Sequence, residues 1–132
     1  MNNAMRTVLY SVCLAWMAAS QASSQPLEIT PVMGAFDSAA GRFHVADIVG
    51  TVLAIKRDGG RACGLEVEDA AAEELNAWLE RPSTQVTDTS AFVTRRDQVE
   101  GIIGALLKLD PSIVCKTAQE ELPASLRSIL RR

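Results

Sequence analysis

The chain has 132 residues, of which 48% are hydrophobic and 22% are charged, and its formal net charge is −3. This length and composition predict one globular domain and leave no room for a second. A net negative surface gives no electrostatic reason to bind nucleic acid or an anionic membrane, so we expect neither as a partner.

Residues 1–22 have the order of segments typical of a secretory signal peptide. Arg6 precedes an apolar run over residues 7–19, and the small residues Ser20 and Ala22 follow it. The run is shorter than the roughly 20 residues that a membrane-spanning helix needs, so an uncleaved anchor is the weaker alternative. We therefore predict cleavage after Ala22, or else after Ser24, and a mature protein that is periplasmic or secreted.

Residues 23–41 show no sustained hydrophobic period, and they contain two prolines and two glycines. This composition predicts an extended segment ahead of a folded domain at 42–132. Its apolar side chains, Met33 and Phe36 among them, are expected to pack on the domain or to contribute to an exposed interaction surface. Trp78 is the other candidate for such a surface.

The first periodic segment spans residues 45–58. Apolar residues recur along it at i, i+3, i+4 and i+7: Val45, Ile48, Val49 and Val52. This is the spacing of one helical face, and Gly59 and Gly60 mark a C-terminal end. A β-hairpin over 51–67, within an α+β fold, is the alternative. It is disfavoured because Gly64 would lie in the middle of its second strand.

The next segment, residues 66–81, predicts an amphipathic helix that ends at Pro82. Its apolar stripe consists of Val67, Ala71, Leu75, Trp78 and Leu79. Acidic residues are concentrated at its start, where they are favourable to the helix dipole.

Residues 91–109 have the strongest helical pattern in the chain, and we expect them to form the central core helix. The apolar side consists of Phe92, Val99, Ile102, Ile103, Leu106 and Leu107. Arg96 and Glu100 are spaced for an i, i+4 ion pair. Gly101 and Gly104 each cost about 1 kcal/mol relative to alanine, which predicts a neighbouring helix close to both.

The last segment begins at Asp110 and Pro111, a favourable N-cap followed by a favourable first helical residue. We expect a short helix to Leu122 and then a last turn or short helix from Pro123 onward. Together these elements predict an all-α bundle of four to five short helices.

Two of the three cysteines remain after signal removal, because Cys13 lies inside the apolar run. Cys13 is not preceded by a small residue, which argues against a lipoprotein anchor. In an exported chain the remaining pair, Cys63 and Cys115, predicts one disulfide. Closing a loop of about 52 residues stabilises the fold by about 4 kcal/mol in the chain-entropy model.

Other roles for Cys63 are weaker alternatives. Arg61 could lower its thiol pKa, but a second cysteine in an oxidising compartment favours a crosslink. Tetrahedral zinc needs about four ligands, whereas the mature chain offers two cysteines and one histidine, His44. We therefore expect no metal ion and no cofactor.

Two constellations could support hydrolysis. His44 with Asp47 has the chemistry of an oriented general base, but no G-x-S-x-G motif accompanies it. The acids Glu66, Glu68 and Asp69 could suggest a glycosidase, but they crowd the first turn of a predicted helix. The basic end, residues 125–132, suits a helix C-terminus better than a membrane surface. No catalytic residue is predicted.

The general plan, a small exported helical domain with one long-range disulfide, is similar to that of the periplasmic acid-stress chaperones. The likeness is architectural and includes no shared motif; an envelope immunity or inhibitor protein would have the same plan. Our prediction is a non-catalytic binding module whose partner is another envelope protein. A small envelope hydrolase and a chaperone-like accessory protein are the alternatives.

Overall fold

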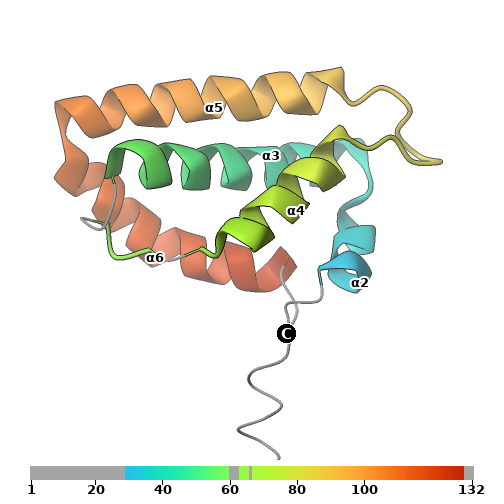
Figure 1. Ribbon diagram of the computed structural model, residues 1–132, viewed down its shortest axis with the longest axis horizontal. Helices are drawn as coiled ribbons and strands as arrows, with labels where there is room; N and C mark the ends of the chain where they lie inside the picture. The colour runs from blue at the N-terminus through green and yellow to red at the C-terminus, as the bar shows by residue number, and fades with distance from the viewer. Residues whose placement is uncertain (1–28, 60–62, 66, 130–132) are drawn as a thin grey trace, which may run out of the picture.

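The computed structural model describes residues 29–59, 63–65 and 67–129 (Figure 1). Its elements, in chain order, are α2 (Thr30–Met33), the 3-10 turn η1 (Gly34–Phe36), α3 (Ala39–Ala54), the π-helical turn η2 (Ile55–Gly59), α4 (Asp69–Glu80), α5 (Ser90–Leu109) and α6 (Pro111–Ile129). Every element in these described ranges is helical, which confirms the all-α prediction. The hairpin alternative is wrong, because residues 51–59 continue α3 into η2.

The long helices lie side by side around α3. Figure 1 shows α3 and α5 running in the same direction, α6 returning antiparallel to both, and α4 crossing α3 obliquely on one side. The short α2 and η1 lie at the end where α3 begins. This arrangement brings the first half of α3 next to the second half of α6.

The helix at the centre is α3, and the prediction that residues 91–109 would be central is wrong. Eight residues of α3 are buried: Arg42, Val45, Ala46, Ile48, Val49, Gly50, Val52 and Ala54. In α5 only Phe92, Gly104 and Leu107 are buried, and Ile102 is 61% exposed. The reason is position, because α3 is covered by three helices and α5 lies at the outside of the bundle.

Close contact between α3 and α5 depends on Gly50. A Cβ atom at this position would lie 2.6 Å from the backbone oxygen of Arg96 and 2.9 Å from the Cβ of Val99. At Gly104 a Cβ would meet the polar ends of the Arg57 and Asp58 side chains of η2, and no backbone atom of a neighbouring helix is among its nearest atoms. The close approach predicted at Gly101 is wrong, since nothing lies within 4 Å of its Cβ position.

The N-terminal part of the fold differs from the extended segment that we predicted for 23–41. Within the described residues of that segment, 30–36 form α2 and η1, and α3 already begins at Ala39. The Ser38 side chain accepts a hydrogen bond from the Gly41 amide at 3.1 Å, so it serves as the N-cap of α3. Burial of Ile29 and Met33 holds this segment on the bundle.

The expected helix break at Pro123 is absent, because α6 continues through it to Ile129. A proline inside a helix costs about 3 kcal/mol. Burying a large apolar side chain gains about 1.5–3 kcal/mol, and Leu122 and Ile129 are 6% and 0% exposed. Packing on both sides of the proline therefore offsets its cost.

The predicted ion pair between Arg96 and Glu100 does not form. Arg96 instead bonds Glu80 at 3.2 Å and Asp97 at 3.1 Å, while Glu100 accepts from Arg57 at 2.5 Å. Both groups lie between helices, where partners from α4 and η2 compete with the partner one turn away.

Candidate functional site

A groove of about 370 Å³ lies between α3, α5 and α6, which is within the size range of ligand sites. It is lined by His44, Asp47, Ile48 and Thr51 of α3, by Ile103 and Leu106 of α5, and by Ile113, Val114, Thr117, Ala118, Glu121, Leu122 and Ser125 of α6. No residue of α4 lines it. All of its lining residues in the described part of the chain therefore belong to the three longest helices.

The two ends of the groove differ in polarity. Because α6 runs antiparallel to α3 (Figure 1), His44 and Asp47 lie at the same end as Glu121 and Ser125. The lining of the opposite end is apolar: Ile103, Leu106, Ile113 and Val114. The groove thus offers an acidic end and an apolar end to whatever binds it.

The apolar end continues onto the surface. Leu106 and Ile113 are 43% and 64% exposed, and outside the groove Ile102 and Leu109 are 61% and 82% exposed. These are four of the five large hydrophobic side chains exposed in the described part of the chain. A concentration of exposed apolar side chains at one corner is typical of an interaction site.

Two polar side chains of the acidic end, Asp47 and Ser125, are already hydrogen-bonded within the protein. Asp47 accepts a hydrogen bond from the Arg95 Nε at 2.7 Å. The Ser125 hydroxyl donates to the backbone oxygen of Glu121 at 3.2 Å. His44 stacks on Phe36 with 6.0 Å between ring centroids. Within the described ranges, no hydrogen bond joins His44 to either Asp47 or a serine.

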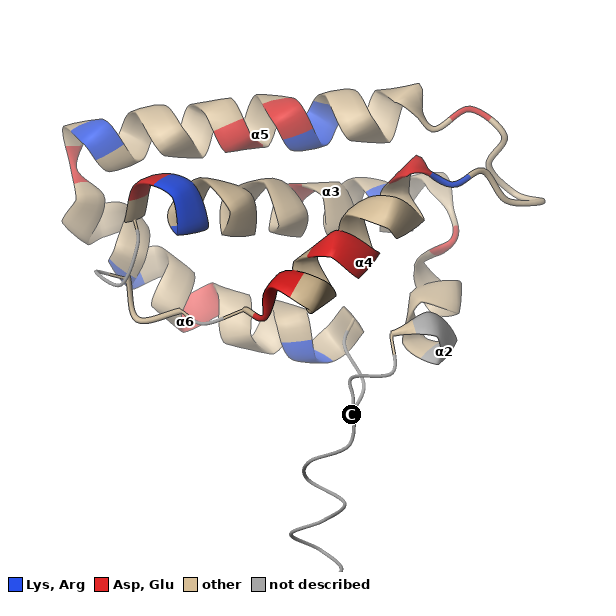
Figure 2. Ribbon diagram, in the orientation of Figure 1, with Lys and Arg blue, Asp and Glu red and all other residues tan. Residues whose placement is uncertain are grey.

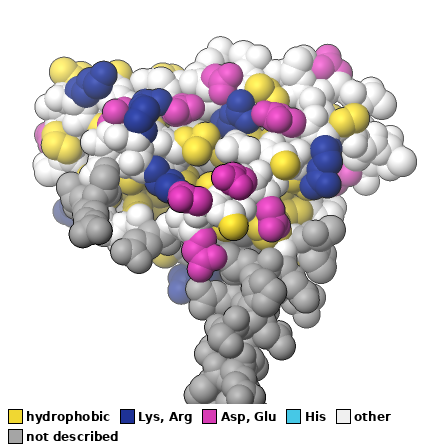
Figure 3. All heavy atoms as spheres, viewed as in Figure 1, with side chains coloured by type: hydrophobic (Ala, Val, Ile, Leu, Met, Phe, Trp, Pro, Cys, Tyr) yellow, Lys and Arg dark blue, Asp and Glu magenta, His cyan; other side chains and the backbone are white. Residues whose placement is uncertain are grey.

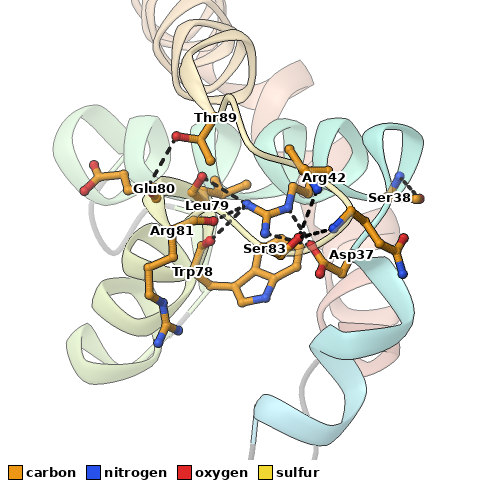
Figure 4. Close-up of polar contacts among 12 residues, drawn as sticks. Asp37, Ser38, Arg42, Trp78, Leu79, Glu80, Arg81, Ser83 and Thr89 are labelled. Atoms are coloured by element: carbon orange, nitrogen blue, oxygen red, sulfur yellow. Dashed lines mark hydrogen bonds and ion pairs between the residues drawn. The ribbon is translucent and has the colours of Figure 1, made fainter.

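A second polar cluster surrounds Arg42, which is 2% exposed (Figure 4). Its guanidinium donates to Asp37 at 2.8 Å from Nε and makes an ion pair with it at 2.7 Å from Nη2. Nη1 donates to the backbone oxygen of Arg81 at 2.7 Å, and more weakly to that of Leu79 at 3.4 Å. The group lies 4.6 Å from the centre of the Trp78 ring.

This cluster is structural. Arg42 binds carbonyl groups at the C-terminal end of α4, which have no partner inside their own helix. Hydrogen bonds from the Ser83 hydroxyl and the Arg42 guanidinium hold the pKa of Asp37 below its usual range. Every buried side-chain polar atom of the described residues has a hydrogen-bond partner. The cluster therefore fixes α4 and its following loop to the start of α3.

The residues predicted for an interaction surface do not form one patch. Met33 is 1% exposed and belongs to the core, so it is not available to a partner. Phe36 is partly buried against His44, and Trp78 is partly buried against Arg42. The exposed apolar surface lies instead at the turn between α5 and α6.

Cys63 and Cys115 lie together as a disulfide, with their Cα atoms 4.7 Å apart, inside the range that disulfides require. They are 0% and 7% exposed. A buried, crosslinked sulfur is not a nucleophile, and Arg61, the group invoked to activate Cys63, lies outside the described residues.

The acidic residues of α4 do not form a catalytic pair. Figure 2 shows them along the helix, and Figure 3 shows that basic side chains are interspersed with acidic ones on this face. Asp69 pairs with Lys56, and Glu68, Glu73 and Glu74 are exposed. Glu66 lies outside the described residues. The described residues contain no group of three or more His, Cys, Asp and Glu that could share a metal ion.

No helix in the described ranges is both long and apolar enough to cross a bilayer. The chain matches no family model, no curated protein and no solved structure. The geometry of the groove is therefore the main basis for inferring a function.

Proposed function

We propose that the protein is an exported, non-catalytic binding module that receives an apolar surface of an envelope protein in the groove between α3, α5 and α6. The observation behind this proposal is the groove itself, with Leu106 and Ile113 exposed at its apolar end. Removing such side chains from water on binding is favourable by about 25 cal/mol per Å² of apolar surface.

Two features support binding rather than catalysis. The hydroxyl of Ser125 donates to a backbone oxygen, and the carboxylate of Asp47 accepts from Arg95. A nucleophile needs an adjacent base that can take its proton, and a base needs an orienting partner. Neither requirement is met by these bonds.

Export is supported by the signal-peptide pattern of residues 1–22 and by the Cys63–Cys115 pair, because disulfides persist in oxidising compartments. Expression of the full chain in a bacterial host, followed by fractionation and intact mass measurement, tests this. We expect a periplasmic or secreted species that begins at Ser23, or at Gln25 if cleavage follows Ser24. An intact chain in the cytoplasm would refute export.

The groove is tested by charge substitution at its exposed edge. Ile113→Asp places a carboxylate at the apolar end, whereas Ala124→Asp places one on an exposed part of α6 outside the groove. Tagged wild-type and variant proteins are used to capture proteins from native envelope extract, and the bound species are identified by mass spectrometry. We expect a partner that is lost with Ile113→Asp and kept with Ala124→Asp. Equal capture by both variants would exclude the groove as the binding site.

A small hydrolase is the second candidate, because His44, Asp47 and Ser125 line the same groove. Its test is hydrolysis of a panel of ester and amide substrates by the purified protein and by His44→Ala. Turnover that disappears in His44→Ala would favour an enzyme, and turnover that is unchanged would exclude His44 as its base.

A further inference from the structure

We propose that the partner presents an amphipathic α-helix of about three turns, with a basic residue at the end that lies over Asp47 and Glu121. This inference rests on the proposed function, since it names the occupant of the same groove. It follows from the length of the groove, from its volume and from the separation of charge along it.

The length of the groove fits a short helix. The lining residues of α6 extend from Ile113 to Ser125, which are twelve positions apart. At about 1.5 Å of rise per residue this is about 18 Å, or about three helical turns. A partner helix of that length presents apolar side chains at i, i+4 and i+7 on one face, which is a common mode of groove recognition.

The volume of about 370 Å³ is suited to inserted side chains rather than to a whole helix. The partner backbone must then lie on the surface, where it also covers the exposed side chains beyond the groove. Ile102 and Leu109 are 61% and 82% exposed at this corner. A small ligand confined to the groove would leave them in water, so the wider apolar surface favours a macromolecular partner.

The charge of the groove determines the orientation. Its charged or titratable lining residues, His44, Asp47 and Glu121, all belong to the acidic end. Asp47 forms an ion pair with Arg95, which largely neutralises its charge, so the Glu121 carboxylate provides the main attraction for a cation. The four residues at the apolar end are uncharged. A basic residue is therefore favoured at one end of the partner helix only.

The described end of α6 is not suited to fill the groove of a second copy. The apolar residues near the C-terminal end of α6 include Leu126, which is partly buried, and Ile129, which is 0% exposed. Both already pack in the core of their own molecule. A second copy could not insert them into the groove without unfolding its last helical turns.

Three labelled peptides test the proposal with the full-length protein. Each is a 14-residue helix-forming sequence, on the order of the length derived above, with leucine at i, i+4 and i+7. Its end carries two lysines, two glutamines or two glutamates. We expect the lysine peptide to bind about five-fold tighter than the glutamine peptide, as exposed ion pairs allow, and the glutamate peptide to bind most weakly. Fluorescence anisotropy measures the affinities.

The variant Glu121→Lys should reverse this order, so that the glutamate peptide binds more tightly than the lysine peptide. Glu120→Lys is the matched control, because Glu120 is an exposed neighbour that does not line the groove. It should leave the order unchanged. Circular dichroism of both variants verifies that the fold is kept, and methyl NMR signals of Ile103 and Ile113 should shift on binding.

The outcomes separate the two proposals. If all three peptides bind equally and Glu121→Lys changes nothing, the charge-oriented helix is refuted while the binding groove stands. If no peptide binds and Ile113→Asp also captures the same partners as wild type, both proposals are refuted. Binding of dodecylamine without binding of any peptide would assign the groove to a small amphiphile. A dimer abolished by Ile113→Asp would assign it to a second copy of the chain.

Discussion

The contact between α3 and α5 can be tested by adding a single methyl group at Gly50. In Gly50→Ala the new Cβ would lie 2.6 Å from the Arg96 backbone oxygen and 2.9 Å from the Cβ of Val99. Overpacking of a core contact costs about 1–3 kcal/mol. The upper part of this range applies, because a backbone oxygen inside a helix cannot turn away. The higher helix propensity of alanine relative to glycine offsets about 1 kcal/mol of this cost.

The expected net effect of Gly50→Ala is a loss of about 2 kcal/mol in the free energy of unfolding. Gly101→Ala is the matched control, because it makes the same change in α5 with nothing within 4 Å. It should gain about 1 kcal/mol from propensity alone. Urea unfolding followed by far-UV circular dichroism measures both values in the purified protein.

The two glycine variants should thus differ in sign. In thermal unfolding, about 1 kcal/mol corresponds to about 4–8 °C for a domain of this size. If Gly50→Ala were as stable as Gly101→Ala, α3 and α5 could not be as close as the structure shows. The packing of α3 at the centre of the bundle would then be refuted.

Three further predictions concern the polar cluster and the crosslink. Arg42→Met should destabilise the fold by about 3–5 kcal/mol, because it removes the buried guanidinium that pairs with Asp37 and donates to the carbonyls at the end of α4; Arg95→Met, at a half-exposed position, should leave the urea midpoint nearly unchanged. The lowered pKa of Asp37 in the folded state means that its ionised form stabilises the fold above pH 3.8, the ordinary aspartate pKa. This stabilisation should be lost as the pH falls from 3.8 through the pKa that Asp37 has in the folded state. Asp37→Asn should remove this part of the pH dependence of the urea midpoint. Replacing Cys63 and Cys115 by alanine should cost about 4 kcal/mol for a sequence separation of 52 residues.

Each of these has a clear contrary result. If Arg42→Met and Arg95→Met lowered the free energy of unfolding equally, the burial of Arg42 would not explain its contribution to stability. A pH profile that is the same in Asp37→Asn and wild type would exclude Asp37 as a source of acid sensitivity. Alkylation of two thiols in the unreduced, denatured protein would show that Cys63 and Cys115 are not crosslinked.

The candidate site is only partly predictable from the sequence. His44 and Asp47 can be recognised as neighbours three residues apart, but Glu121 and Ser125 join them only because α6 runs back along α3. One feature of the α5 sequence does point to the groove. Ile102 and Leu106 make the apolar side of this helix wider than its contact with one neighbouring helix can bury. Nothing in the pattern around Arg42 distinguishes it from a surface arginine.

The sequence by itself indicated that the fold is all-helical, where α4 and α5 lie along the chain, and that Cys63 and Cys115 would lie together. Helical periodicity and end signals act between residues a few positions apart, so they can be read locally. The tertiary structure decided that α3 is central, that α6 passes through Pro123, and that a groove opens between α3, α5 and α6. Burial depends on which helices surround a residue, and that is a property of the whole bundle rather than of any local segment.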